Sequence, residues 1–556
     1  MVHAIPDGPN PNDSITVGFG AWRAVGGNAL DGNDTLFASS DVITVDAGPG
    51  NDLIGIFNDV QARVLLGSGD DTLRIGESSA TLVGGLGSDS VYLFDGAYSV
   101  HTGSGDDTIR LFADRATIVA GNGNDRVHMV EGTLSLHLGS GNDTVDFLDG
   151  SATIVTGGGS DSISAGDGKL SVHVGSGNDT LHVFRSDGTV VLGGGNDKVT
   201  GSGGRFSIHA GSGNDTVGLS RASSTIVAGN GNDSVRAVAG SYSIHLGNGN
   251  DTVRVDFANA TVDAGHGHDS ILLFNSQTFL AAAGGHDTVH VAGGDGVLHV
   301  GGSFNKIVMS SGAFELVTGG GHDTIMGLGI GGSWSVHGHG FDSVSGFRGN
   351  GQFVFDQGHD TISIHRFSGT VTANGGHDKI TVTDSTALVN AGGGRDTISV
   401  GGAITLHAGH NDLIQFEDQS QHNFFGSQAH VSRSVLAITT GGHDTFVYQY
   451  SDSNNEAGLH AGDANTVGVG TAVIADFAKH TDVLRFHDTD GDSFTQADLQ
   501  NAATVTDHGL HHNVDIVIHT THGMAGTIVL VGDGTLHHKL NSINALVNHG
   551  YHLQFA

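Results

Sequence analysis

The chain has 556 residues, of which 92 are Gly, 4 are Pro and none is Cys, and its formal net charge is −36 at pH 7. Without cysteine there is no disulfide framework, so the stability of the fold must have another source. Because 58 acidic residues stand against 22 basic ones, we expect divalent cations as partners and no nucleic acid.

The first 30 residues are expected to form an N-terminal cap. Residues 1–20 contain neither a basic n-region nor an apolar h-region, so we expect no cleavable signal peptide. No stretch of 18 consecutive apolar residues occurs in the sequence, and a transmembrane segment is therefore not expected.

From about residue 31 to residue 415 an aspartate returns every 18 residues, with occasional steps of 19, at the end of a glycine-rich turn. Repetition at a fixed period is the signature of a solenoid in which each repeat forms one coil. The aspartates expected to bind a metal ion are Asp34, Asp52, Asp71, Asp89, Asp107, Asp125, Asp143, Asp161, Asp179, Asp197, Asp215, Asp233, Asp251, Asp269, Asp287, Asp323, Asp342, Asp360, Asp378 and Asp396.

One coil can be laid out on residues 107–125. A strand is predicted over residues 108–111, a turn over 113–115, a second strand over 116–119 and a glycine turn over 121–125. The residue two places after each aspartate is aliphatic, and so is one position of the second strand, as in Ile109 and Ile118. These two columns predict a thin core between two parallel sheets, which is a weak source of stability on its own.

The turn and the residues after it, Gly-Asn-Gly-Asn-Asp-Arg-Val at 121–127, resemble the RTX (repeats-in-toxin, hemolysin-type) calcium-binding nonapeptide. This resemblance implies an all-β, parallel β-roll of 18-residue coils, in which turn carbonyls and the aspartate carboxylate bind about twenty Ca2+ ions between successive coils. The turn glycines that it assigns to these sites are Gly103, Gly105, Gly121, Gly123, Gly139, Gly141, Gly175, Gly177, Gly211, Gly213, Gly229, Gly231, Gly247 and Gly249.

The chain departs from the family pattern in the second half of each coil, where an apolar residue replaces the aspartate. One edge should therefore hold a single row of calcium ions and the other an apolar seam. The seam residues are Tyr98, Ala116, Leu134, Ala152, Leu170, Phe206 and Tyr242.

An alternative role for the aspartates is an Asx-turn ladder, in which each carboxylate caps amides of its own turn. Electrostatics argues against it, because unit charges on coils about 4.8 Å apart repel by about 0.9 kcal/mol even in water. Over about twenty steps this repulsion reaches the ~5–15 kcal/mol stability of a typical domain. Calcium reverses the sign, since about twenty Ca2+ ions would nearly cancel the formal charge. The chain should therefore stay unfolded at low calcium and fold at millimolar calcium.

Residues 416–556 are predicted to form a small, mainly β C-terminal domain. The segments 441–448, 473–477, 481–486 and 526–532 are similar to the closing region of type I-secreted RTX proteins, which implies the type I secretion apparatus as a partner. A domain that only caps the open β-edge is the alternative. Residues 488–492 form either a further calcium loop or an acidic turn, and residues 495–502 follow a helical pattern.

The outward positions of the second strand follow a 36-residue period, with His101, His137 and His173 alternating with Val119 and Val155. Duplication history, lateral assembly of chains and ice binding all remain open, although the imidazoles would interrupt an ice-like lattice. The motif falters at residue 305, where Asn replaces Asp and a calcium ion could be lost. Histidine also enters the turns, either for transition-metal or pH responses or as turn residues that lend only carbonyls; these are His268, His286, His322, His359, His377 and His443.

Enzymatic signatures such as HExxH, GxSxG or a Cys nucleophile are absent from the sequence. The sequence therefore predicts a non-enzymatic, secreted calcium-binding structural protein, located extracellularly or at the cell surface. It would fold on external Ca2+ and self-associate into an S-layer, a filament or a biofilm matrix. An extracellular adhesin or ice-binding protein is the alternative, and a polysaccharide-modifying enzyme is the third.

Overall fold

The computed structural model describes residues 14–17, 32–39, 42–57, 61–112, 115–328, 332–409 and 412–416. Beyond these it describes Leu546 and eight strands of the C-terminal region. The chain divides into two compact units, Met1–Ser270 and Ile271–Ala556. This division falls inside the predicted solenoid, and the predicted boundaries at residues 30 and 415 stay a prediction.

The predicted all-β, parallel solenoid of 18-residue coils is confirmed. In the coil that begins at Asp107, β10 (Thr108–Phe112) and β11 (Arg115–Asn122) are the two strands. Residues of β10 pair in parallel with residues 18 places earlier and 18 places later, so that Ile109 lies between Val91 and Val127. The aliphatic and β-branched side chains alternate inward and outward along both strands, which is the pattern of a pleated strand with one buried face.

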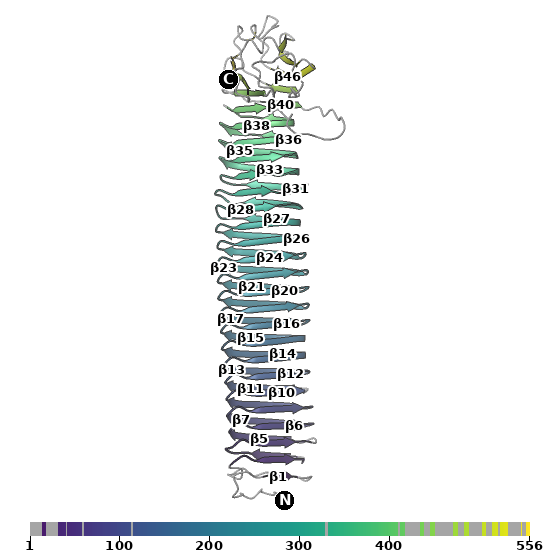
Figure 1. Cartoon of the computed structure of the whole chain (residues 1–556), viewed down its shortest axis with the longest axis vertical. Coiled ribbons are helices and arrows are strands. Elements are labelled where there is room, and N and C mark those ends of the chain that lie inside the picture. Colours follow the sequence, from purple (N-terminus) through teal and green to yellow (C-terminus); the bar gives the residue numbers. More distant parts are fainter. Residues whose placement is uncertain are drawn as a thin grey trace. The chain divides into compact units, whose positions relative to one another are not determined.

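Two parallel sheets run through the first unit, one from each half of the coil (Figure 1). The first sheet contains β2 (Thr35–Ala38), β4 (Leu53–Ile56), β6 (Thr72–Gly76), β8 (Ser90–Phe94), β10, β12 (Arg126–Met129), β16 (Thr180–Phe184), β18 (Lys198–Ser202), β20 (Thr216–Ser220), β22 (Ser234–Val238) and β24 (Thr252–Asp256). The second contains β3 (Val42–Asp46), β5 (Gln61–Ser68), β7 (Ser79–Leu86), β9 (Ala97–Ser104), β11, β13 (Thr133–Ser140), β17 (Asp187–Gly194), β19 (Arg205–Ser212), β21 (Ser223–Asn230), β23 (Ser241–Asn248) and β25 (Asn259–His266). The long strands β14 (Thr144–Gly158) and β15 (Ser162–Ser176) belong to both, and β1 (Ser14–Val17) pairs with β2.

The core of the first unit lies between these sheets, and the predicted aliphatic columns form it. Side chains of both columns are fully or almost fully buried, from Leu73 to Val145 on the first sheet and from Val100 to Val172 on the second. The seam side chains at the opposite edge are also buried, with Tyr98 only 4% exposed and Tyr242 5% exposed. The seam is therefore apolar as predicted, but it is part of the core and presents no surface for a partner.

The second unit repeats the same construction with less regular coils. Its first sheet contains β28 (Lys306–Met309), β30 (Thr324–Gly327), β32 (Ser343–Ser345), β34 (Thr361–His365) and β39 (Leu413–Phe416). Its second contains β29 (Ala313–Thr318), β31 (Ser333–Gly338), β33 (Gly349–Gly358), β35 (Phe367–Gly376) and β37 (Gly393–Gly394). The strands β27 (Thr288–Val300), β36 (Lys379–Asn390) and β38 (Thr397–His407) span both halves of a coil, and β26 (Ser270–Gly284) begins at the last residue of the first unit.

Parallel pairing does not stop at residue 415, where the solenoid is predicted to end. Strand β39 pairs with β41 (Thr445–Tyr450) and β38 with β40 (Ser434–Ile438). These lead on in parallel to β43 (Val483–Asp488), β47 (His552–Phe555), β42 (Thr471–Ala475) and β46 (Gly523–Val531). Antiparallel pairing enters only through β44 (Ala503–Asp507) and β45 (Val514–Thr520). The predicted acidic loop at 488–492 begins at Asp488, the last residue of β43, and its other residues lie outside the described part of the chain, as does the helical pattern at 495–502.

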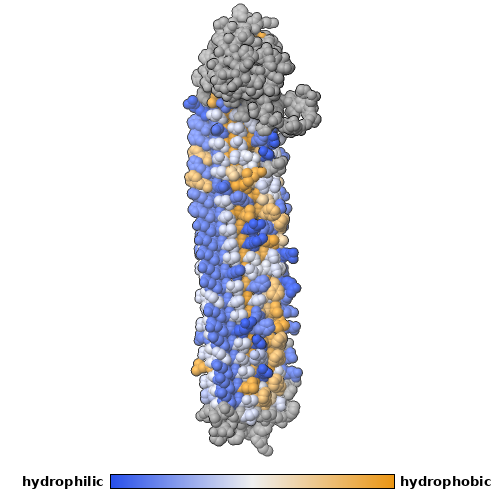
Figure 2. Space-filling model, viewed as in Figure 1, coloured by the Kyte–Doolittle hydropathy of each residue, from blue (hydrophilic) through white to orange (hydrophobic). Residues whose placement is uncertain are grey.

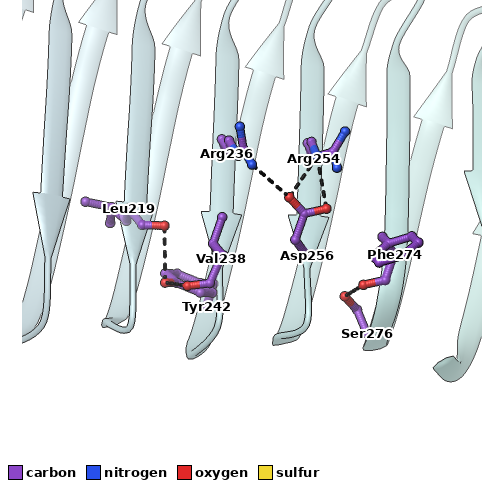
Figure 3. A network of polar contacts seen from close by, with 8 residues as sticks. All are labelled: Leu219, Arg236, Val238, Tyr242, Arg254, Asp256, Phe274 and Ser276. Carbon is purple, nitrogen blue, oxygen red and sulfur yellow. Dashed lines mark hydrogen bonds and ion pairs between the residues drawn. The ribbon is translucent and has the colours of Figure 1, made fainter. Parts of the chain in front are cut away.

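Polar contacts fix neighbouring coils of the first unit where the repeat varies (Figure 3). Asp256, which replaces the usual apolar or small residue at its position, accepts hydrogen bonds from Arg254 at 2.7 and 2.9 Å and from Arg236 of the preceding coil at 3.3 Å. The buried hydroxyl of Tyr242 donates to the carbonyl of Val238 at 3.1 Å. Both contacts satisfy polar groups that burial would otherwise penalise.

Candidate calcium-binding edge

The glycine turns form one edge of each unit, and their backbone requires glycine. All fourteen predicted turn glycines of the first unit have a positive φ, between 108° and 142°. A Cβ on Gly121 would collide with the carbonyl oxygen of Gly103, and one on Gly123 with that of Gly105. Backbone carbonyl oxygens of one turn thus point toward the glycines of the next, which leaves hard oxygen atoms between successive turns.

The structure brings the repeated aspartates together in one continuous column in each unit, here called the aspartate column. Every predicted aspartate is buried, with at most 4% of its surface exposed. At most rungs the Oδ1 accepts a hydrogen bond from the backbone N–H of the column residue one coil earlier, as from Asp107 to Asp125 at 2.9 Å and from Asp125 to Asp143 at 2.8 Å. The carboxylates therefore cap amides of the neighbouring coil, which differs from the own-turn Asx ladder considered above.

The second carboxylate oxygen, Oδ2, is buried and lacks a hydrogen-bond donor at most rungs of the column. A buried acceptor without a donor carries the full loss of its hydration, and for a charged group that loss is several kcal/mol. The aspartates with such an Oδ2 include Asp52, Asp71, Asp89, Asp125, Asp143, Asp161, Asp179, Asp197, Asp215, Asp233, Asp251, Asp342, Asp360, Asp378 and Asp396.

Burial and mutual repulsion raise the pKa of carboxyl groups in this column, including those of Asp52, Asp89 and Asp125. Burial is the largest cause and raises the pKa of Asp52, Asp89 and Asp125 to about 7, while the N–H of the preceding aspartate acts in the opposite direction. In the second unit, burial and then the neighbouring Asp323 raise the pKa of Asp342 to about 8. Ionised aspartates at neutral pH thus destabilise the metal-free coils, and either protons or cations must neutralise the column.

One coil of the second unit has a neutral asparagine where the other coils have a buried carboxylate. Asn305 keeps the Oδ1 contact, accepting from the N–H of Asp287 at 2.8 Å, and its Nδ2 donates to the carbonyl of Gly301 at 2.7 Å. The amide thus supplies a donor where the carboxylates of the other coils have only a lone pair. The sequence predicted that the motif falters at this coil, and the structure shows that the asparagine satisfies its own turn.

A second column of side chains runs in the opposite direction just outside the first. Where an asparagine precedes the aspartate, its Oδ1 accepts the backbone N–H of the equivalent residue one coil later, as from Asn142 to Asn124 and from Asn196 to Asn178, both at 2.7 Å. Each turn is therefore bonded by one side chain to the coil before it and by another to the coil after it. The sequence signal is the recurring Asn before Asp, whose contacts were not predicted.

The histidines predicted at this position divide into different environments. His359 and His377 take over the asparagine role, since their Nδ1 atoms accept the N–H of His377 and of Arg395 at 2.9 Å. Their rings stack with centroids 5.0 Å apart. His322 lies between Phe304 and Phe341, with centroid distances of 5.1 and 4.9 Å. These histidines therefore make side-chain contacts, whereas one prediction was that they lend only their carbonyls to the turns. His443 lies outside the described residues.

The donors at this edge fit calcium better than a transition metal. No group of three or more His, Cys, Asp or Glu side chains that could hold a metal occurs in the described part of the chain. A cation between two turns would meet carboxylate and backbone carbonyl oxygens, which are the ligands of Ca2+, and no nitrogen or sulfur. The buried Oδ2 atoms are the groups that a bound cation would satisfy.

The repeat also matches a family model. The RTX calcium-binding nonapeptide repeat matches residues 28–54, 75–109, 148–181, 186–217 and 223–253. The chain is an RTX-repeat protein. RTX repeats bind Ca2+, so calcium is a ligand of this chain, and its coils form a calcium-binding β-roll. No curated protein and no solved structure matches the chain.

The matched segments of this RTX-repeat protein all lie in the first unit, but the aspartate column of the second unit has the same local geometry. Asp360 accepts from the N–H of Asp342 at 2.7 Å, and Asp378 from that of Asp360 at 2.8 Å. The column also reaches Asp412, which was not among the predicted sites: its Oδ1 accepts from the N–H of Asp396 at 2.9 Å. The 16-residue step hid this rung from a search at period 18. No helix in the described part of the chain is long and apolar enough to cross a membrane.

Proposed function

We propose that the chain is a secreted structural protein that folds when its aspartate column binds external Ca2+ and then self-assembles at the cell surface. The observation that carries the proposal is the column of buried carboxylates, in which the Oδ2 atom lacks a donor at the fifteen aspartates named above. The residues that would hold the ions are the twenty predicted aspartates with the carbonyls of the turn glycines, and the number of ions would be about twenty.

Calcium would supply positive charge at the position where each coil lacks it. Without it, each carboxylate with a pKa raised from 3.8 to about 7 costs about 4 kcal/mol when ionised. A few such sites exceed the ~5–15 kcal/mol stability of a typical domain. At the low calcium level of a cytosol the chain would therefore stay unfolded, and outside the cell binding energy would become folding energy.

Secretion by a type I apparatus follows from the same switch. A chain that remains unfolded inside can be threaded through an exporter, and folding outside prevents its return. The C-terminal segments similar to the closing region of type I-secreted proteins support this route, and all four of them overlap strands of the structure, β41, β42, β43 and β46.

Assembly is supported by apolar side chains on the outer face of the first sheet. Phe57, Phe94, Phe112 and Leu148 occupy the same position in their coils and are 37–46% exposed. The rings of Phe94 and Phe112 stack with their centroids 5.9 Å apart. Figure 2 shows apolar surface gathered in a band along the coils of the first unit. Exposed apolar side chains in a contiguous row are typical of association surfaces, and a second copy of this chain repeats the same coil spacing.

Electron microscopy and light scattering of the purified full chain test the proposal. With millimolar calcium we expect sheets or filaments, and in chelator no ordered assembly. Substituting Phe94→Ser and Phe112→Ser should reduce assembly without loss of the β circular dichroism signal. Leu86→Ser is the matched control, because Leu86 is 63% exposed but lies on a glycine turn. Folded chains that stay monomeric at millimolar calcium would refute assembly and leave calcium-dependent folding intact.

A further inference from the structure

We propose that a groove on the outer face of the second sheet of the first unit binds an acidic polysaccharide along the direction of coil stacking. The groove has a volume of about 520 Å3 and crosses five consecutive strands, β3, β5, β7, β9 and β11. This size lies within the ~300–1,000 Å3 of ordinary ligand sites.

Two guanidinium groups set the charge of the groove. Arg63 and Arg115 line it, and no acidic side chain does. Within the described residues neither arginine has an ion pair, whereas Arg185 pairs with Asp167 at 2.6 Å and Arg205 with Asp187 at 2.8 Å. Two cations without a described ion pair in one hollow, with no acidic side chain in its lining, favour an anionic ligand.

The spacing of the two arginines selects the kind of anion. Arg63 is aligned through Thr81 and Ser99 with Thr117, three coils further on, and Arg115 precedes Thr117 by two residues on the same strand. At about 4.8 Å per coil the two guanidinium groups are anchored roughly 14 Å apart along the stack. This separation suits a ligand that carries at least two negative groups on one extended chain.

The positive charges of the groove are too sparse to make nucleic acid a better ligand than an acidic polysaccharide. Duplex DNA carries one charge per ~1.7 Å, and tight binding requires a matching row of cations. Two cations over roughly 14 Å suit a polymer whose acidic groups are widely spaced, such as a polysaccharide with one carboxylate in each short repeat. An arginine can bind such a carboxylate in a two-point contact.

The remaining lining of the groove suits sugar hydroxyl groups. Thr81, Ser99 and Thr117 lie in one row across adjacent strands and expose their side chains on the outer face. Each hydroxyl can donate one hydrogen bond and accept others. Their spacing repeats at every coil, so a polymer that lies along the row meets the same polar group again and again.

This site is separate from the calcium edge. No member of the aspartate column lines the groove. Loss of binding by substitution of the arginines should therefore leave calcium-dependent folding and assembly unchanged, so a failure of this proposal and a failure of the proposed function can be told apart.

The test uses the full chain, folded in millimolar calcium, and a fluorescently labelled hyaluronan oligosaccharide, which carries one carboxylate per disaccharide. Binding is measured by fluorescence anisotropy for the unmodified chain and for the double variant Arg63→Gln/Arg115→Gln. The matched control is Arg205→Gln, because Arg205 occupies the same position in its coil as Arg115 but is paired with Asp187.

We expect the double variant to bind about tenfold more weakly, the control to bind like the unmodified chain, and the carboxyl-reduced oligosaccharide to bind to none of them. Binding by the unmodified chain should also weaken as ionic strength rises, which needs no variant. Equal binding by the double variant, equal binding of the carboxyl-reduced sugar, insensitivity to salt, or tighter binding of single-stranded DNA of similar length would each overturn the proposal.

Discussion

Replacing two members of the aspartate column by asparagine should stabilise the metal-free coils and weaken the calcium-bound ones. Burial raises the pKa of Asp89 and of Asp125 from 3.8 to about 7. A rise of about three units corresponds to about 4 kcal/mol for each ionised group at neutral pH. The double variant Asp89→Asn/Asp125→Asn removes both charges, so the gain is about 8 kcal/mol in the absence of calcium.

The natural coil at Asn305 shows how the amides would be accommodated. Its Oδ1 keeps the bond to the preceding coil and its Nδ2 finds a carbonyl of its own turn. In the presence of calcium the substitutions should instead destabilise the coils, because each one removes a negatively charged ligand of a divalent cation.

Hydrogen exchange of peptides from β7 to β11 measures the local stability of the substituted coils. A local measurement is needed because the coils of a repeat array open in separate segments. In chelator at pH 7 we expect slower exchange in the double variant than in the unmodified chain, and in calcium faster exchange. The control is Asp106→Asn, an exposed position at which the next coil already has Asn124. Faster exchange of Asp89→Asn/Asp125→Asn in both conditions would refute the argument that the column is destabilised by its own charge.

Four further outcomes follow from the same structure. In chelator the β-signal in circular dichroism should be present near pH 4 and lost as pH rises through about 6–8, because the raised pKa values stabilise the protonated column; a signal independent of pH would contradict this. Asn305→Asp should add about one calcium ion per chain, measured by atomic emission. Gly123→Ala should lower the free energy of unfolding, measured by thermal denaturation, by more than about 2 kcal/mol, because φ is 132° and the added Cβ meets the Gly105 carbonyl. Gly320→Ala, with no atom within 4 Å of its Cβ, should have little effect. Phe112→Ser should slow assembly in light scattering, and unchanged rates would remove that face from the interface.

Much of this fold could be predicted because the sequence repeats one simple unit. The period of 18 fixes the register of most coils, and the alternation around Ile109 and Ile118 fixes which side chains face the core. The turn glycines follow from steric constraint, since their carbonyl neighbours leave no room for a Cβ. The alignment of the aspartates along one edge also followed from the motif, but their binding of individual calcium ions remains a prediction.

Contacts between coils could not be predicted, because they depend on which atom of a side chain meets which neighbour. The aspartate Oδ1 reaches the coil before it and the asparagine Oδ1 reaches the coil after it, as Asp143 and Asn124 illustrate. Neither direction is encoded in the period. The groove between Arg63 and Arg115 was missed for a related reason: residues 52 apart in sequence share a face only once the register is known.

The number of calcium ions bound by the full chain tests the central claim most directly. The chain is dialysed to equilibrium against millimolar calcium, and its bound calcium is measured by atomic emission as the excess over the dialysate, together with the far-ultraviolet circular dichroism spectrum. The account predicts about twenty ions per chain, with a β-signal that disappears on chelation at neutral pH. A β-signal that persists at pH 7 with few or no bound ions would contradict it.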